Sequence, residues 1–141
     1  MTDGPADLLE QTADLVAVRS ESCSEGDLAD RIEDEMRTLP HLEVHRIGDN
    51  VVARTQLGRA QRVVLGGHTD TVPANGNETP RIDGDVLWGL GSADMKGGLA
   101  VMSELARRHR EPPLDVTYVF YAREEIAADR SGLLEIEEHD P

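Results

Sequence analysis

The first 40 residues carry apolar side chains at helical spacing and predict two amphipathic helices. One helix is expected over residues 7–18, where acidic side chains in the first turn interact favourably with the helix dipole. After a polar break, a second helix is expected over residues 27–38, because Pro40 cannot continue it. Neither helix carries an evident set of chemically reactive residues.

Beyond Pro40 the pattern changes to short alternating or continuous apolar runs, which are typical of strands. Residues 62–66 and 116–121 are rich in β-branched or aromatic side chains and predict buried strands on either side of a helix over residues 99–108. Strands that alternate with helices predict an α/β fold, a layered mixed, largely parallel sheet flanked by helices. Shorter strands or hairpins are expected at residues 42–47, 51–55 and 82–88.

Composition narrows the classes of function. The chain has 28 acidic and 14 basic residues and a formal net charge of −14, whereas nucleic acids and anionic membranes favour basic partners. No apolar run is long enough to span a bilayer and the N-terminus lacks the profile of a secretory signal, so we expect a cytoplasmic protein. The single cysteine, Cys23, excludes an internal disulfide, and any metal must bind histidine and carboxylates.

The first candidate segment, residues 66–73, follows a predicted strand and contains His68 and Asp70. Open α/β sheets place their sites at the carboxyl ends of strands. Asp70 lies on the same side of an extended chain as His68, so it can accept the second N–H of the imidazole and leave the other nitrogen for a metal. The alternative is a surface turn with an incidental histidine.

Two further segments supply carboxylates. Asp94 stands between glycines just before a helix, where it can bridge two cations or simply cap the helix. Glu124 and Glu125 follow the last predicted strand, so one can bind metal while the other acts as general base, although acidic pairs are common in this chain. Together, His68, Asp94 and Glu125 form a ligand set that suits zinc or another divalent first-row ion.

These segments resemble the co-catalytic zinc peptidase family of aminoacylases, carboxypeptidases and deacetylases. Residues 50–55 and 81–89 look most like the members that remove succinate from N-succinyl-LL-2,6-diaminopimelate. The resemblance covers nearly the whole chain and rests on three motifs, Gly67-His68-Thr69-Asp70-Thr71-Val72-Pro73, Gly91-Ser92-Ala93-Asp94-Met95-Lys96-Gly97 and Glu124-Glu125.

The resemblance implies a role for each candidate residue in a site that holds two Zn²⁺ or Co²⁺ ions. By this analogy His68 binds one ion, Glu125 binds the other, and Asp94 bridges both. Glu124 would be the general base and acid, and Asp70 would hold the imidazole of His68.

The resemblance further implies a cis peptide bond between Asp94 and Met95, and Lys96 is a candidate anchor for that loop. A further Glu and a later His ligand, an inserted dimerisation domain and the residues that grip the substrate's carboxylates have no counterpart before Pro141. We therefore interpret residues 1–141 as the N-terminal portion of the catalytic domain, expected to bind metal weakly and to hydrolyse little by itself. Its uncovered sheet edge is expected to favour self-association, and the full-length enzyme is expected to be a homodimer.

The implied reaction converts N-succinyl-LL-2,6-diaminopimelate and water to succinate and LL-2,6-diaminopimelate, a step in lysine and diaminopimelate biosynthesis. One alternative is another small N-acyl amino acid substrate, as in acetylornithine deacetylation or a carboxypeptidase reaction. Another is a non-catalytic remnant domain. The presence of Glu124 beside the proposed ligands favours an enzyme, because a binding module has no physical need for a general base.

Overall fold

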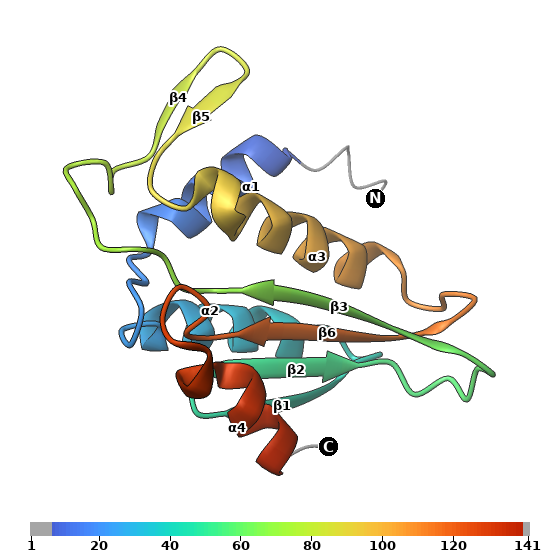
Figure 1. Cartoon of the computed structure of the whole chain (residues 1–141). Helices are drawn as coiled ribbons and strands as arrows, with labels where there is room; N and C mark the ends of the chain where they lie inside the picture. Colours follow the sequence, from blue (N-terminus) through green and yellow to red (C-terminus); the bar gives the residue numbers. More distant parts are fainter. Residues whose placement is uncertain (1–6, 140–141) are drawn as a thin grey trace.

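The computed structural model describes residues 7–139, and Figure 1 shows a sheet with helices packed against it. The residues that bear on a secretory signal lie outside this range. Both N-terminal helices form where the apolar spacing predicts them, α1 at Leu8–Ala17 and α2 at Gly26–Arg37. None of the helices within the described range combines the length and apolar character that a bilayer crossing requires.

The main sheet has the strand order β1-β2-β6-β3. Strand β2 pairs antiparallel with both β1 and β6, whereas β3 and β6 are parallel. The expected mixed sheet is confirmed, but it is less parallel than expected, because the β1–β2 hairpin joins β6 in the antiparallel sense. The strands are β1 (Glu43–Ile47), β2 (Asn50–Arg54), β3 (Arg62–His68) and β6 (Asp115–Tyr121).

Helices cover both faces of this sheet (Figure 1). Helix α2 packs against β1 and β2, while α3 (Gly97–Arg108) packs against β3 and β6 on the same face. The apolar core lies between these elements, and its fully buried side chains include Leu28, Ile32, Met36, Leu99, Tyr118 and Phe120. Burial of this face is the main stabilising contribution that the sequence pattern encodes.

Two features differ from the sequence-based expectation. Strand β3 is buried only at its carboxyl end, because it lies at the edge of the sheet, and Val64 is 62% exposed. Helix α4 (Gly132–His139), which we did not predict, contacts β1 on the opposite side of the sheet from α2. Its Leu133 and Leu134 are largely exposed, so its apolar pattern is weak, and polar contacts of Glu135 tie it to the sheet.

The expected hairpin forms from β4 (Arg81–Asp83) and β5 (Val86–Trp88) and projects from the rest of the molecule in Figure 1. It leads into an irregular turn over Ser92–Lys96, which precedes α3. A short 3-10 turn over Ala128–Arg130 connects β6 to α4. Asp94 lies in the turn over Ser92–Lys96, whereas Glu124 and Glu125 lie in the loop between the end of β6 and the 3-10 turn.

Candidate metal site

The parallel pairing of β3 with β6 places the two strands' carboxyl ends side by side. His68 lies opposite Tyr121 in the register, so the histidine and the segment after Tyr121 emerge at one edge of the sheet. Gly67 permits the close approach of the helical layer, because a Cβ there would lie 2.8 Å from a side-chain carbon of Leu99 and 3.0 Å from the sulfur of Met102. Gly67 therefore serves packing at the strand end, whereas a Cβ at Gly66 would meet nothing within 4 Å.

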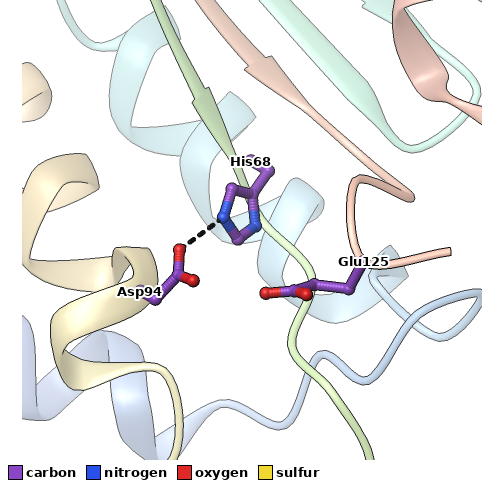
Figure 2. A group of neighbouring side chains, drawn as sticks. All are labelled: His68, Asp94 and Glu125. Atoms are coloured by element: carbon purple, nitrogen blue, oxygen red, sulfur yellow. Dashed lines mark hydrogen bonds and ion pairs between the residues drawn. The ribbon is translucent and has the colours of Figure 1, made fainter. Parts of the chain in front are cut away.

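Three side chains from distant segments converge at this edge. Figure 2 shows His68 from the end of β3, Asp94 from the turn before α3 and Glu125 from the loop after β6, all facing a shared space. One potential ligand atom from each lies within 4.8 Å of the others, and Nε2 of His68 is 2.8 Å from Oδ1 of Asp94. The predicted convergence of these residues is confirmed, while their roles as ligands stay predictions.

Asp70 is buried next to this group and contacts both His68 and the turn that carries Glu125. Its buried carboxylate accepts hydrogen bonds from the Ser22 hydroxyl at 2.6 Å and from the backbone amides of Glu124 and Glu125 at 2.9 and 3.0 Å. Nδ1 of His68 is 3.0 Å from the carbonyl oxygen of Asp70 and 3.4 Å from its carboxylate. The imidazole is hydrogen-bonded to the backbone carbonyl of Asp70 and lies close to its carboxylate, while the role of Asp70 in holding His68 for a metal stays a prediction.

The electrostatics of the group favour a bound cation. Hydrogen bonding to Asp70 and then to Asp94 raises the pKa of His68 to about 9 despite its burial. Burial raises the pKa of Asp70, but hydrogen bonds led by that from His68 outweigh it and hold that pKa below its usual range. Burial and the charge of Asp94 raise the pKa of Glu125, so this carboxylate is costly to ionise without a nearby positive charge.

The donor set and its spacing fit a divalent ion of the zinc type. Imidazole nitrogen and carboxylate oxygens are ordinary zinc ligands at about 2.0–2.2 Å. Ligand atoms within 4.8 Å of one another can meet one such ion, or two ions about 3.5–4 Å apart, after small side-chain adjustments. His68, Asp94 and Glu125 are therefore the residues that could hold metal.

The turn that carries Asp94 is held in place by contacts with Thr71 and with the end of α1. The peptide bond from Asp94 to Met95 is cis, as the resemblance implies. Gly91 has a left-handed φ of 78°, and a Cβ there would lie 2.7 Å from the Thr71 methyl group. The buried Lys96 donates to the carbonyls at the end of α1, which confirms it as an anchor, and burial lowers its pKa to about 8.

The alternative role of Asp94 as a helix cap is not seen. Helix α3 begins at Gly97, and no side-chain oxygen caps it. The side chain of Asp94 is instead 73% exposed and turned toward His68. Oδ1 of this carboxylate contacts the imidazole of His68, and Asp94 is therefore positioned to bind a cation beside that histidine.

Glu124 is fixed by its backbone and not by its side chain. Its amide donates to Asp70, and its exposed side chain is not part of the converging group. Its role as general base stays a prediction. Ser22 and Glu25, which hold this region from the loop before α2, escaped the sequence analysis, because they lie 48 or more residues from their partners and belong to no periodic pattern.

Ligand-type side chains gathered at the carboxyl ends of parallel strands define a candidate metal site in an α/β fold. The family assignment follows from a family model. The model of peptidase family M20/M25/M40 matches residues 64–140, more than half of the chain, and the chain belongs to this family. This membership confirms the resemblance drawn from the three motifs.

Relatives among curated proteins match all or most of this chain. A Mycobacterium tuberculosis (strain CDC 1551 / Oshkosh) protein named "Putative succinyl-diaminopimelate desuccinylase DapE" is 44% identical over 142 residues, covering 100% of this chain and 40% of its own length. The succinyl-diaminopimelate desuccinylase of Corynebacterium glutamicum is 42% identical over 136 residues, covering 92% of this chain and 37% of its own length. The chain thus spans about two fifths of the length of the relatives it matches.

Solved structures place the fold in the same group. Human carnosine dipeptidase 1 superposes with a TM-score of 0.79 at 17% identity, covering 94% of this chain and 35% of its own. Aminopeptidase PepT from Bacillus cereus superposes with a TM-score of 0.72 at 27% identity, covering 94% of this chain and 39% of its own. These likenesses confirm the α/β fold.

Proposed function

We propose that the chain supplies the N-terminal portion of the catalytic domain of a two-metal amide hydrolase, with N-succinyl-LL-2,6-diaminopimelate as its substrate. The observation that carries this proposal is the convergence of His68, Asp94 and Glu125 from three separate segments. The names of the mycobacterial and corynebacterial relatives support the choice of substrate.

The proposed site holds two Zn²⁺ or Co²⁺ ions. His68 would hold one ion, Glu125 would hold the other, and Asp94 would serve both. When bound, such ions lower the pKa of a water molecule and polarise the carbonyl of the scissile amide. The short separation of the three side chains supports this arrangement.

The proposed proton transfers are carried out by Glu124, whose backbone is held by Asp70. Glu124 accepts a proton from the water whose oxygen forms a bond to the amide carbon. As the carbon–nitrogen bond breaks, Glu124 delivers that proton to the leaving amine, which gives succinate and LL-2,6-diaminopimelate. Asp70 holds the backbone of both Glu124 and Glu125, so the proton acceptor and the metal ligand keep a fixed relation.

A chimera tests the proposal directly. Residues 1–141 replace the matching part of the Corynebacterium glutamicum relative, and the amino groups newly freed by hydrolysis are measured with N-succinyl-LL-2,6-diaminopimelate, N-acetylornithine and a dipeptide as substrates. We expect Zn²⁺- or Co²⁺-dependent hydrolysis of the succinylated substrate above the others. A folded, metal-loaded chimera that hydrolyses none of them would contradict the proposal, and a preference for another substrate would replace the proposed one.

The 141-residue chain by itself is expected to bind metal weakly. It offers His68 and Asp94 to one ion and Asp94 and Glu125 to the other, whereas catalytic zinc typically has three protein ligands. We expect little or no hydrolysis from it. Efficient turnover by the isolated chain with stoichiometric metal would contradict this expectation.

A further inference from the structure

We propose that Glu25 is a positioning residue for the Glu124–Glu125 pair, holding the turn that aims these side chains at the metal site. The inference rests on the proposed function. It assigns work to a loop before α2 that carries none of the candidate ligands, and it concerns the backbone of the site and not its ligands.

Glu25 reaches across the molecule to this turn. It stands at the N-cap of α2 but makes no capping hydrogen bond with its side chain. Its Oε1 instead accepts the backbone amide of Arg123, 98 residues away, at 3.1 Å. The residue is fully buried, at 0% exposure, so this contact is screened from water.

Three successive amides after β6 are therefore held by two buried carboxylates. The amide of Arg123 donates to Glu25, while those of Glu124 and Glu125 donate to the two oxygens of Asp70. Consecutive backbone amides favour nearby negative charge, which the carboxylates of Glu25 and Asp70 supply here. Loss of either carboxylate would release part of the turn.

The turn needs such support because its first residue has an unusual conformation. Arg123 has a left-handed φ of 62°, which few residues with a side chain adopt. Its guanidinium is held on the other side by the carbonyl of Arg130 at 2.7 Å and by Glu135 at 2.8 Å. Glu25 thus holds the backbone of Arg123, while Arg130 and Glu135 hold its side chain.

A buried carboxylate at position 25 lowers the stability of the fold, so packing alone does not explain its presence. Its Oε2 is buried without a hydrogen-bond partner among the described residues, and burial raises its pKa, although backbone hydrogen bonds from Cys23, from Glu25 itself and from Arg123 oppose that rise. A buried polar atom that lacks a partner lowers stability, so packing alone would favour an apolar side chain here. The geometry at Arg123 gives a reason for the carboxylate to be present.

The test separates an acceptor role from packing. In the 141-residue chain, Glu25→Gln keeps an acceptor oxygen, Glu25→Leu removes it at similar size, and Glu25→Asp withdraws it by one methylene. Glu35→Leu, within helix α2 and away from the turn, is the control for replacing a glutamate by leucine. Amide hydrogen exchange of residues 123–125 and Co²⁺ affinity from absorption titration are measured for each variant.

We expect Glu25→Leu and Glu25→Asp to speed exchange at residues 123–125 and to weaken Co²⁺ binding by about 10-fold, in the range of substitutions just outside a metal's ligands. Glu25→Gln and the Glu35→Leu control should leave both nearly unchanged. Unchanged exchange and affinity in a folded Glu25→Leu or Glu25→Asp chain would overturn the inference. If Glu25→Leu fails to fold, the Glu25→Asp and Glu25→Gln pair still decides.

The two proposals fail in distinguishable ways. If neither the wild-type chain nor the chimera binds Co²⁺, the proposed metal site is wrong, yet the exchange of residues 123–125 still reports whether Glu25 holds the turn. If the wild-type chain binds Co²⁺ and every Glu25 variant binds it equally, the metal site stands and the positioning role is lost.

Discussion

The parallel pair β3–β6 has a buried aspartate at each end, and the two ends do different work. At the carboxyl end, the Asp70 carboxylate accepts hydrogen bonds from the Ser22 hydroxyl and from the backbone amides of Glu124 and Glu125. At the amino end, Asp115 holds another loop in the same way, by accepting the Thr55 hydroxyl at 2.7 Å and the amides of Leu57 and Arg59, each at 2.8 Å.

The comparison shows that a lowered pKa does not by itself identify a functional site. Hydrogen bonds led by that from Thr55 lower the pKa of Asp115 to about 2, and the pKa of Asp70 is lowered as well. Only the end with Asp70 also gathers the His68 imidazole and the exposed Asp94 carboxylate, whereas the other end offers the cation of Arg62 at 3.8 Å. Strand direction explains the difference, because loops with ligands follow the carboxyl ends.

The largest expected contrast between the ends concerns turnover. In the chimera, Glu124→Gln should lower kcat by about 10²–10⁴-fold, because it removes the proposed proton acceptor while leaving the proposed ligands in place. Metal content, measured by elemental analysis, should not change. Asp115→Asn in the same chimera should keep its kcat. An unchanged rate in Glu124→Gln would remove the assigned role.

We expect the second-largest difference between the two ends of the β3–β6 pair in metal affinity. Asp94→Asn in the 141-residue chain should weaken Co²⁺ binding by at least about 100-fold, the upper end of the effect of substitutions outside the ligand set. Because this side chain is 73% exposed, the urea midpoint should stay close to the wild-type value. Co²⁺ titration and urea unfolding of the same sample measure both. Wild-type affinity in this variant would argue against a bridging role.

Asp70→Asn should affect both properties, which distinguishes it from Asp94→Asn and from Asp115→Asn. We expect metal affinity to fall by about 10–100-fold, because the amide group cannot accept the same set of hydrogen bonds and the imidazole and the Glu pair lose their orientation. The unfolding midpoint should fall too. Calorimetric titration with Zn²⁺ and urea unfolding test this, and a loss of stability with normal metal affinity would make Asp70 a second purely structural aspartate.

The smallest expected effect is a pH dependence of folding stability that arises from Asp115 at the amino end of the β3–β6 pair. The folded-state pKa of Asp115, about 2, lies below its ordinary value of 3.8, so its ionised form stabilises the fold at pH values above 3.8. That contribution is lost as pH falls toward 2. The stability difference between wild type and Asp115→Asn in urea should therefore shrink over this range, and a constant difference would contradict the assignment. Co²⁺ affinity at neutral pH should be equal in the two chains.

Sequence patterns predicted the elements around both ends but not their environments. Apolar spacing placed both N-terminal helices and the strands to within about two residues. The same pattern did not reveal that β3 lies at a sheet edge, because burial depends on which strand pairs with it. Helix α4 was missed because its eight residues are held by polar contacts of Glu135 and carry only a weak apolar face.

The candidate site divides along the same line. The motifs around His68, Asp94 and Glu124-Glu125 were sufficient to name the ligand-type residues and the family, because each motif is a short stretch of chain with its own chemistry. Their convergence, the backbone contact of Asp70 with His68 and the reach of Glu25 to Arg123 depend on contacts between residues far apart in the chain. Local sequence determines what a segment can become and which atoms it can offer, whereas only packing in three dimensions decides which of those atoms meet.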